Sequence, residues 1–141
     1  MIAYLDTSVV LRVILSQPQS LREWDDLELG VASRLLQVEC LRTIDRFWHQ
    51  GELNEQEVEQ KRSAVEVLLK RLVLLPPTED IWRIASQPFP TIINSLDAIH
   101  LATAMTYRDQ QPNDERPIFF ATHDNQLATA AREMNFDVLG A

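Results

Sequence analysis

The first fifteen residues, MIAYLDTSVVLRVIL (1–15), decide the fold class. Residues 2–5 form a continuous apolar run, which is typical of a strand that is buried on both faces. Asp6 follows the run directly, and the pattern of residues 8–15 then favours a helix. A buried strand that passes through one acidic residue into a helix indicates an α/β layer fold.

The same alternation of apolar runs and helical stretches continues along the chain. We expect further strands at residues 29–32, 72–75 and 118–121, and a weaker one at 136–139. Helical patterns predict helices at 34–49, from Asn54 onward, and at 78–87, 96–107 and 125–134. Gly51 predicts a helix stop, and the pair Asn54 and Glu57 predicts a capping box. The chain of 141 residues is therefore expected to form one domain, residues 1–141.

Composition limits the class of protein. The net charge of −8 argues against a wide nucleic-acid-binding surface, but it suits a carboxylate cluster that binds cations or an acidic face that binds a basic partner. Cys40 is the one cysteine, which excludes a disulfide within the chain and favours a reducing compartment. Asp6 and Arg12 interrupt the first apolar run, so we expect a cytoplasmic protein with no signal peptide and no membrane span.

Four acidic residues stand at positions that can converge. Asp6 follows the strand expected at 2–5, and Asp124 lies three residues beyond the strand expected at 118–121. Sites in α/β sheets form outside the carboxyl ends of the strands. Asp97 begins an apolar helix, and Glu39 lies at the border of the apolar face of another. We therefore expect the four carboxylates to meet at one edge of the sheet.

Converging carboxylates suit divalent metal chemistry. Mg²⁺ and Mn²⁺ are hard cations that prefer oxygen ligands. One ion can activate a water molecule for phosphodiester hydrolysis, and a second can stabilise the leaving oxygen. Without metal the carboxylates repel one another, so at least one of them should have a raised pKa.

Each acid also has a purely structural interpretation. Asp6 and Asp124 can cap the helices that follow them, and Asp97 suits the dipole at a helix start. Glu39 can pair with Arg42 at i,i+3. The joint placement of all four acids at one edge favours the metal site.

The basic residues are less informative. Arg12, Arg42 and Arg46 are candidates for contacting a phosphate-bearing substrate, although an ion-pair face is an equally good interpretation of the last two. His100, one turn after Asp97, is interpreted as a packed helix residue rather than a metal ligand. His123 is adjacent to Asp124, so we expect the two side chains to point differently and assign His123 no metal.

The sequence does not match two other classes of α/β protein, nor does it match nucleotide-binding enzymes. A response-regulator receiver needs an acidic pair near the first strand and a lysine after the last, whereas Asp6 has no acidic neighbour and no lysine follows Lys70. A haloacid-dehalogenase-type phosphatase needs a second aspartate at position 8, which is Ser8. No glycine-rich loop is present to bind a nucleotide phosphate.

Four motifs together resemble a known family. They are YLDTSVVLRVIL (4–15), ASRLLQVECLR (32–42), SLDAIHLATAM (95–105) and IFFATHDNQLATAA (118–131). Their residues and order resemble PIN domains, especially the VapC toxins of bacterial toxin–antitoxin pairs. The resemblance spans essentially the whole chain, although residues 52–90 match only in general character.

The resemblance implies an α/β/α sandwich with a parallel sheet of about five strands. It implies an endoribonuclease in which Asp6, Glu39, Asp97 and Asp124 bind one or two Mg²⁺ or Mn²⁺ ions. It assigns supporting hydroxyls to Thr7, Ser8 and Thr122. The expected partners are an RNA substrate, a VapB-like antitoxin and a second copy of the chain in a homodimer. The alternative is a non-catalytic PIN-fold interaction domain that binds a protein partner, but no acid of the quartet is missing.

Overall fold

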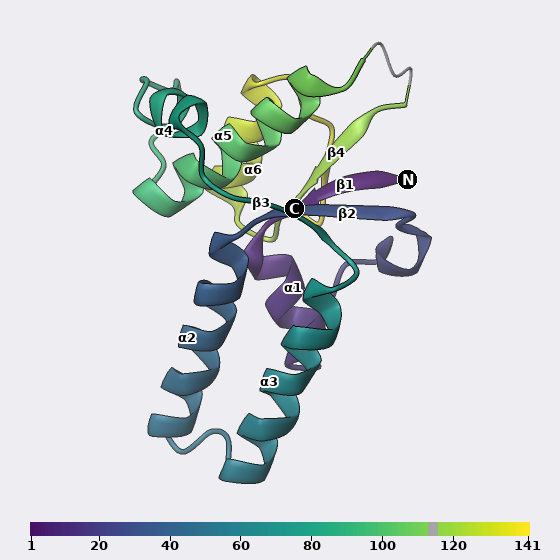
Figure 1. Ribbon diagram of the computed structural model, residues 1–141, viewed down its shortest axis with the longest axis vertical. Coiled ribbons are helices and arrows are strands. Elements are labelled where there is room, and N and C mark those ends of the chain that lie inside the picture. The colour runs from purple at the N-terminus through teal and green to yellow at the C-terminus, as the bar shows by residue number, and fades with distance from the viewer. Residues whose placement is uncertain (113–115) are drawn as a thin grey trace.

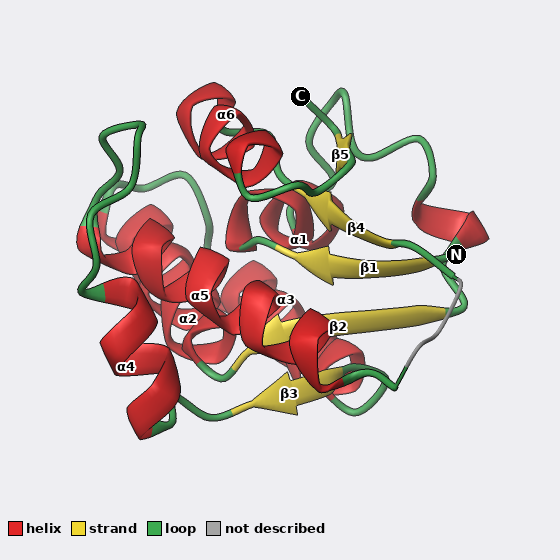
Figure 2. Ribbon diagram, turned by 90° about the horizontal axis from the view of Figure 1, so that it is seen from above, coloured by secondary structure: helices red, strands yellow, loops and turns green. Residues whose placement is uncertain are grey.

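The computed structural model describes residues 1–112 and 116–141 and contains a parallel sheet between two layers of helices (Figures 1 and 2). The strands are β1 (Ile2–Leu5), β2 (Leu29–Ser33), β3 (Val73–Leu75), β4 (Ile118–Ala121) and β5 (Val138–Leu139). The helices are α1 (Thr7–Ile14), α2 (Leu35–His49), α3 (Glu55–Leu69), α4 (Glu79–Ala85), α5 (Ser95–Gln110) and α6 (Asn125–Glu133). The predicted α/β/α sandwich with five parallel strands is confirmed, and a short 3-10 helix, η1 (Trp24–Asp26), was not predicted.

The sheet has the strand order β3-β2-β1-β4-β5, and each neighbouring pair is parallel. The chain moves from β1 toward β2 and β3 on one side, and it later crosses to β4 and β5 on the other side. The two directions diverge at the β1–β4 pair, where Leu5 lies opposite Ala121. Such a switch point leaves a crevice outside the carboxyl ends of the two strands, which is where α/β proteins place their sites.

Alternate side chains of β1 enter two separate cores. Ala3 and Leu5 pack with residues of α1, α2 and α3, whereas Ile2 and Tyr4 pack with residues of α5 and α6. Successive strand side chains point to opposite faces of a sheet, so a strand covered on both faces must be apolar throughout. This is why the run at 2–5 shows no alternation in its sequence. Figure 1 shows α1, α2 and α3 on one side of the sheet and α4, α5 and α6 on the other.

Helices α2 and α3 form a hairpin that extends away from the sheet (Figure 1). Gly51 ends the turn after α2 with a φ of +74°, in the left-handed region that glycine adopts readily. Asn54 caps α3 by accepting a hydrogen bond of 2.8 Å from the backbone N–H of Glu57, whose carboxylate accepts one of 3.2 Å in return. The predicted helix stop and capping box are both confirmed. The sheet-side end of α2 lies at the same edge as the end of β1.

Cys40 packs within the core against the sheet, as a small apolar residue would, and burial followed by the charge of Glu39 raises the pKa of its thiol to about 12. None of the helices in the described part of the chain has the length and apolar character needed to cross a membrane.

Candidate metal centre

Asp6 lies at the carboxyl end of β1, where its backbone N–H donates to the carbonyl of Ala121 at 3.0 Å. It occupies the N-cap position of α1, yet its side chain makes no capping hydrogen bond. Instead, its Oδ2 accepts hydrogen bonds from Ser8 Oγ at 2.6 Å and from Thr122 Oγ1 at 2.9 Å. The capping interpretation of Asp6 is therefore wrong, and hydroxyls from both sides of the switch point hold its carboxylate.

Glu39 reaches the same edge from α2. Its Oε1 accepts hydrogen bonds from Thr7 Oγ1 at 3.0 Å and from His100 Nε2 at 2.6 Å. The pairing with Arg42 that its spacing allowed is not formed, because the guanidinium of Arg42 lies 3.4 Å from Asp45 instead. Glu39 is thus held toward the sheet, and its side chain is still 23% exposed to solvent.

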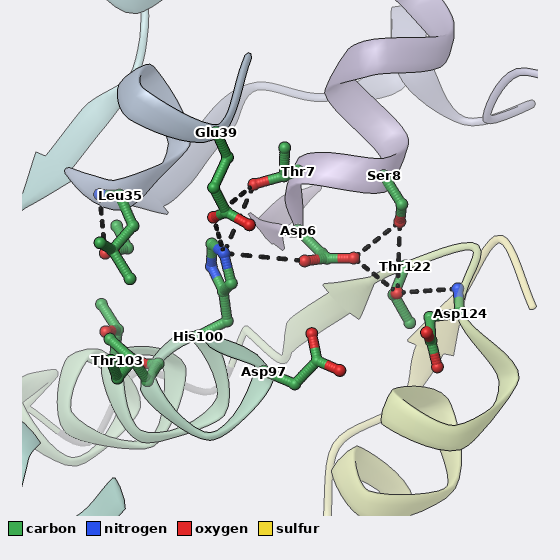
Figure 3. A network of polar contacts seen from close by, with 12 residues as sticks. Asp6, Thr7, Ser8, Leu35, Glu39, Asp97, His100, Thr103, Thr122 and Asp124 are labelled. Atoms are coloured by element: carbon green, nitrogen blue, oxygen red, sulfur yellow. Dashed lines mark hydrogen bonds and ion pairs between the residues drawn. The ribbon is translucent and has the colours of Figure 1, made fainter. Parts of the chain in front are cut away.

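Asp97 lies in the first turn of α5, and its backbone N–H donates to Asn94 Oδ1 at 2.8 Å. Figure 3 shows its side chain projecting from α5 toward Asp6. Burial, followed by the negative charges of Asp6 and Asp124, raises the pKa of Asp97 to about 6. This matches the expectation that one member of a carboxylate cluster without metal would hold its proton more tightly.

Asp124 follows β4 and caps α6, because its Oδ1 accepts the backbone N–H of Leu127 at 2.8 Å. Asp124 therefore caps the following helix, as its structural interpretation predicted, and Oδ1 is the oxygen that does so. Its own N–H donates to Thr122 Oγ1 at 3.0 Å, so Thr122 links Asp124 to Asp6. Asp124 is the exposed member of the quartet.

The chemistry of this group fits a divalent cation. Its four members come from four separate segments and surround one region in Figure 3, and all their side-chain donors are carboxylate oxygens. As the side chains lie, the described residues contain no ready-made group of three or more His, Cys, Asp or Glu ligands. Repulsion between the carboxylates opposes such a close group of ligands when no cation is bound. The quartet is thus a set of suitable ligands held near one another.

His100 is the residue of this site that the sequence reasoning missed. It is fully buried, its Nε2 contacts Glu39, and its Nδ1 lies 2.7 Å from the hydroxyl of Tyr4. Burial opposes a charge on the ring, but the hydrogen bond to Glu39 and the nearby carboxylates outweigh it, so the pKa of His100 is raised. The sequence signal that could have revealed this role was an ionisable residue among the apolar Ile99, Leu101 and Ala102, since buried polar groups require hydrogen-bond partners.

The three candidate arginines have different surroundings. Arg12 donates to the carbonyl of Gln19 at 3.1 Å and lines a cavity of about 500 Å³. Arg42 pairs with Asp45, and the guanidinium of Arg46 lies 5.6 Å from the ring centroid of Phe47.

His123 lines the cavity beside Arg12 and does not turn toward the carboxylates. Its backbone N–H donates to Ser8 Oγ at 3.0 Å, and its Nδ1 lies 2.8 Å from the carbonyl oxygen of Gly140. One lining residue of the cavity, His123, thus precedes Asp124 in the chain and donates a hydrogen bond to Ser8, which supports Asp6.

Comparison with known proteins agrees with these motifs. Ribonuclease VapC47 of Mycobacterium tuberculosis is 31% identical over 140 residues, which cover 94% of this chain and 92% of that protein. The structure is similar to VapBC2 of Rickettsia felis bound to a promoter DNA fragment, with a TM-score of 0.67, 16% identity and coverage of 98% and 97% of the two chains. It is also similar to a toxin–antitoxin complex from Klebsiella pneumoniae, with a TM-score of 0.66, 12% identity and coverage of 94% of each chain. The model of the PIN domain family matches residues 3–133, and the chain therefore belongs to that family.

Proposed function

We propose that this protein is a metal-dependent endoribonuclease that acts as the toxin of a toxin–antitoxin pair. The observation that carries the proposal is the meeting of Asp6, Glu39, Asp97 and Asp124 at the switch point of the sheet. Membership of the PIN domain family and the 31% identity to a ribonuclease, VapC47, support the same reaction.

The quartet would hold one or two Mg²⁺ or Mn²⁺ ions. A bound ion supplies activation of water and neutralisation of charge during phosphodiester hydrolysis. Thr7, Ser8 and Thr122 donate hydrogen bonds to Glu39 and Asp6, and so they fix the carboxylates that would bind the metal. The expected products carry a 5′-phosphate and a 3′-hydroxyl.

The non-catalytic alternative is less well supported. A domain that only binds a protein has no need to keep four carboxylates together, because their mutual repulsion is unfavourable in the absence of a cation. Burial, followed by the charges of Asp6 and Asp124, raises the pKa of Asp97, in agreement with such repulsion.

Arg12 is the arginine to which we assign contact with RNA. It lines a cavity together with Arg22 and His123, the residue before Asp124 in the chain, and a substrate phosphate bound in this cavity would contact its guanidinium. Arg42 and Arg46 instead have partners on α2 itself.

The partner we propose is a protein antitoxin, as in the VapBC and toxin–antitoxin structures that share this fold. A second cavity, of about 460 Å³, lies between α1 and α3 and is lined by apolar residues that include Val13, Trp24 and Val67. Such a cavity can accept apolar side chains of an antitoxin segment, while a basic side chain of the same segment reaches the carboxylates. We also propose that the toxin itself is a homodimer, since Trp82 and Ile92 expose large apolar side chains.

Replacement of Asp97 tests the metal site. We expect Asp97→Asn to lower the Mn²⁺-dependent cleavage rate by at least about 100-fold, because even residues that only support metal ligands contribute 10–100-fold. Cleavage of RNA is measured with Mg²⁺, with Mn²⁺ and with chelator. Asp109→Asn, which changes a 69% exposed side chain on the same helix, is the matched control and should cleave like the wild type. Equal cleavage by Asp97→Asn and wild type would remove Asp97 from the site.

The pKa of Asp97 predicts how stability depends on pH. Because its folded pKa is about 6 against an ordinary 3.8, the folded state binds more protons than the unfolded state between these values. The contribution of Asp97 to the stability of the metal-free protein therefore falls as the pH rises through this window. In chelator at pH 7.5, Asp97→Asn should melt at a higher temperature than the wild type, and the gap should narrow toward pH 4. Saturating Mn²⁺ at pH 7.5 should make the wild type melt at a higher temperature than Asp97→Asn. If Asp97→Asn still melted at the higher temperature, metal binding by Asp97 would be contradicted.

Replacement of Arg12 tests the RNA contact. Arg12→Ala should raise KM for RNA about tenfold while kcat changes little, since a phosphate contact away from the scissile bond strengthens binding of substrate and transition state alike. Arg62→Ala, an exposed arginine on α3, serves as the control. An unchanged KM, or a fall in kcat alone, would exclude the proposed role.

The antitoxin proposal predicts the effect of a charge in the apolar cavity. Val67 is 55% exposed, so Val67→Asp should weaken binding of the protein encoded by the neighbouring gene without reducing RNA cleavage. Calorimetry on the purified pair measures the affinity, and Glu66→Ala, the exposed neighbour on α3, should bind normally. If the gene product gave the wild type no increase in melting temperature, the toxin assignment would fail while the nuclease assignment would stand.

A further inference from the structure

A chain of buried hydrogen bonds lies behind Glu39. The hydroxyl of Tyr4 is 2.7 Å from His100 Nδ1, and His100 Nε2 is 2.6 Å from Glu39 Oε1. Tyr4 and His100 have no exposed surface, whereas the Glu39 side chain is 23% exposed. These hydrogen bonds therefore connect the centre of the core with a carboxylate that is partly exposed to solvent.

The direction of the proton donors follows from the groups involved. A carboxylate only accepts hydrogen bonds, so the contact with Glu39 requires a proton on Nε2 of His100. The phenol of Tyr4 carries one proton donor, and its oxygen lies 2.7 Å from Nδ1, within hydrogen-bond distance. Both ring nitrogens are thus engaged, and neither has a lone pair available for a metal ion.

The far end of this row of hydrogen bonds is packed inside the sheet. Tyr4 belongs to the central strand β1, and its ring stacks on Phe120 of β4 with centroids 5.3 Å apart and an interplanar angle of 20°. Leu5 and Ala121 continue the same strand pair up to Asp6. Through His100 and Tyr4, the carboxylate of Glu39 is therefore connected to β1 and β4, the two strands that also position Asp6.

The bonds also distinguish the two oxygens of Glu39. Thr7 and His100 both donate to Oε1, so Oε2 is the oxygen that they leave for a ligand. Polar groups in an apolar core cost stability unless they are hydrogen-bonded, and an aliphatic residue at position 100 would fill the space without that demand. The placement of a Tyr–His pair here is explained if the pair acts on Glu39.

We infer that His100, anchored by Tyr4, is a positioning residue that fixes the carboxylate of Glu39 for binding of a divalent cation. The inference rests on the proposed function, because Glu39 must be a metal ligand for its orientation to matter. His100 itself contacts no metal in this account. Its contribution is transmitted through one oxygen of Glu39.

Two variants of His100 separate its two bonds. The amide nitrogen of glutamine can take the place of Nε2, so His100→Gln keeps a donor within reach of Glu39. The shorter asparagine resembles the Nδ1 side of the ring, so His100→Asn keeps a polar group near Tyr4 but cannot reach Glu39. Tyr4→Phe removes only the hydroxyl at the far end. Cys40→Ala is the control for a weakened core, because Cys40 is fully buried beside Glu39 in the chain and lies among apolar residues.

The deciding experiment is Mn²⁺ titration of each folded variant by calorimetry, with circular dichroism to measure stability. We expect His100→Asn to raise the Mn²⁺ Kd about 10–100-fold, which is the usual effect of losing a partner of a metal ligand. His100→Gln should recover most of the affinity, Tyr4→Phe should lose about 3–10-fold as for one hydrogen bond, and Cys40→Ala should bind like the wild type. In the metal-free protein, proton NMR should show a protected ring N–H of His100 that is lost in Glu39→Ala.

The alternatives give different results. Wild-type affinity in His100→Asn would overturn the inference while leaving the nuclease proposal intact, and so would an equal loss in Cys40→Ala. Equal losses in His100→Gln and His100→Asn with no effect of Tyr4→Phe would identify the ring as a metal ligand instead. Absence of Mn²⁺ binding by the wild type would overturn the proposed function and this inference together.

Discussion

The parallel register of β1 and β4 is the constraint on which the site depends. It places Leu5 opposite Ala121, so the residues that follow the two strands, Asp6 and Thr122, must emerge side by side. Both strands are buried on two faces, and a shift of one residue would turn each apolar side chain into the wrong core. The packing of the sheet therefore determines where the first carboxylate stands, and the other three are delivered to it by α2, α5 and the start of α6.

The site must also accommodate the negative charges of its carboxylates. The hydroxyls of Ser8 and Thr122 donate hydrogen bonds to Asp6, and the hydroxyl of Thr7 and the ring Nε2–H of His100 donate to Glu39. Asp97 has no comparable compensation, and its pKa is raised. A divalent cation would remove this imbalance, which connects the stability of the folded chain with its proposed chemistry. The four carboxylates and the groups that donate hydrogen bonds to them therefore have to be considered together.

The sequence predicted the sheet and the approximate bounds of its strands and α-helices, because continuous apolar runs and helical spacing are local signals. It also predicted that the four acids would gather, since strand ends meet at one edge of a parallel sheet. It did not predict the partner of Glu39: the local signal favoured Arg42 at i,i+3, whereas the tertiary fold supplied His100 from 61 residues away. It likewise did not predict that the side chain of Asp6, which occupies the N-cap position of α1, would bond hydroxyls instead of capping the helix. Such choices depend on contacts between distant segments, which no local pattern contains.

We propose that one group of carboxylates binds the catalytic cation. Anomalous diffraction from crystals of the protein with Mn²⁺ tests this most directly, because the ion is located independently of any activity. We predict an anomalous peak among Asp6, Glu39, Asp97 and Asp124, with Oε2 of Glu39 on the ion and Oε1 still bonded to His100. A peak elsewhere, or no peak at saturating Mn²⁺, would contradict the account.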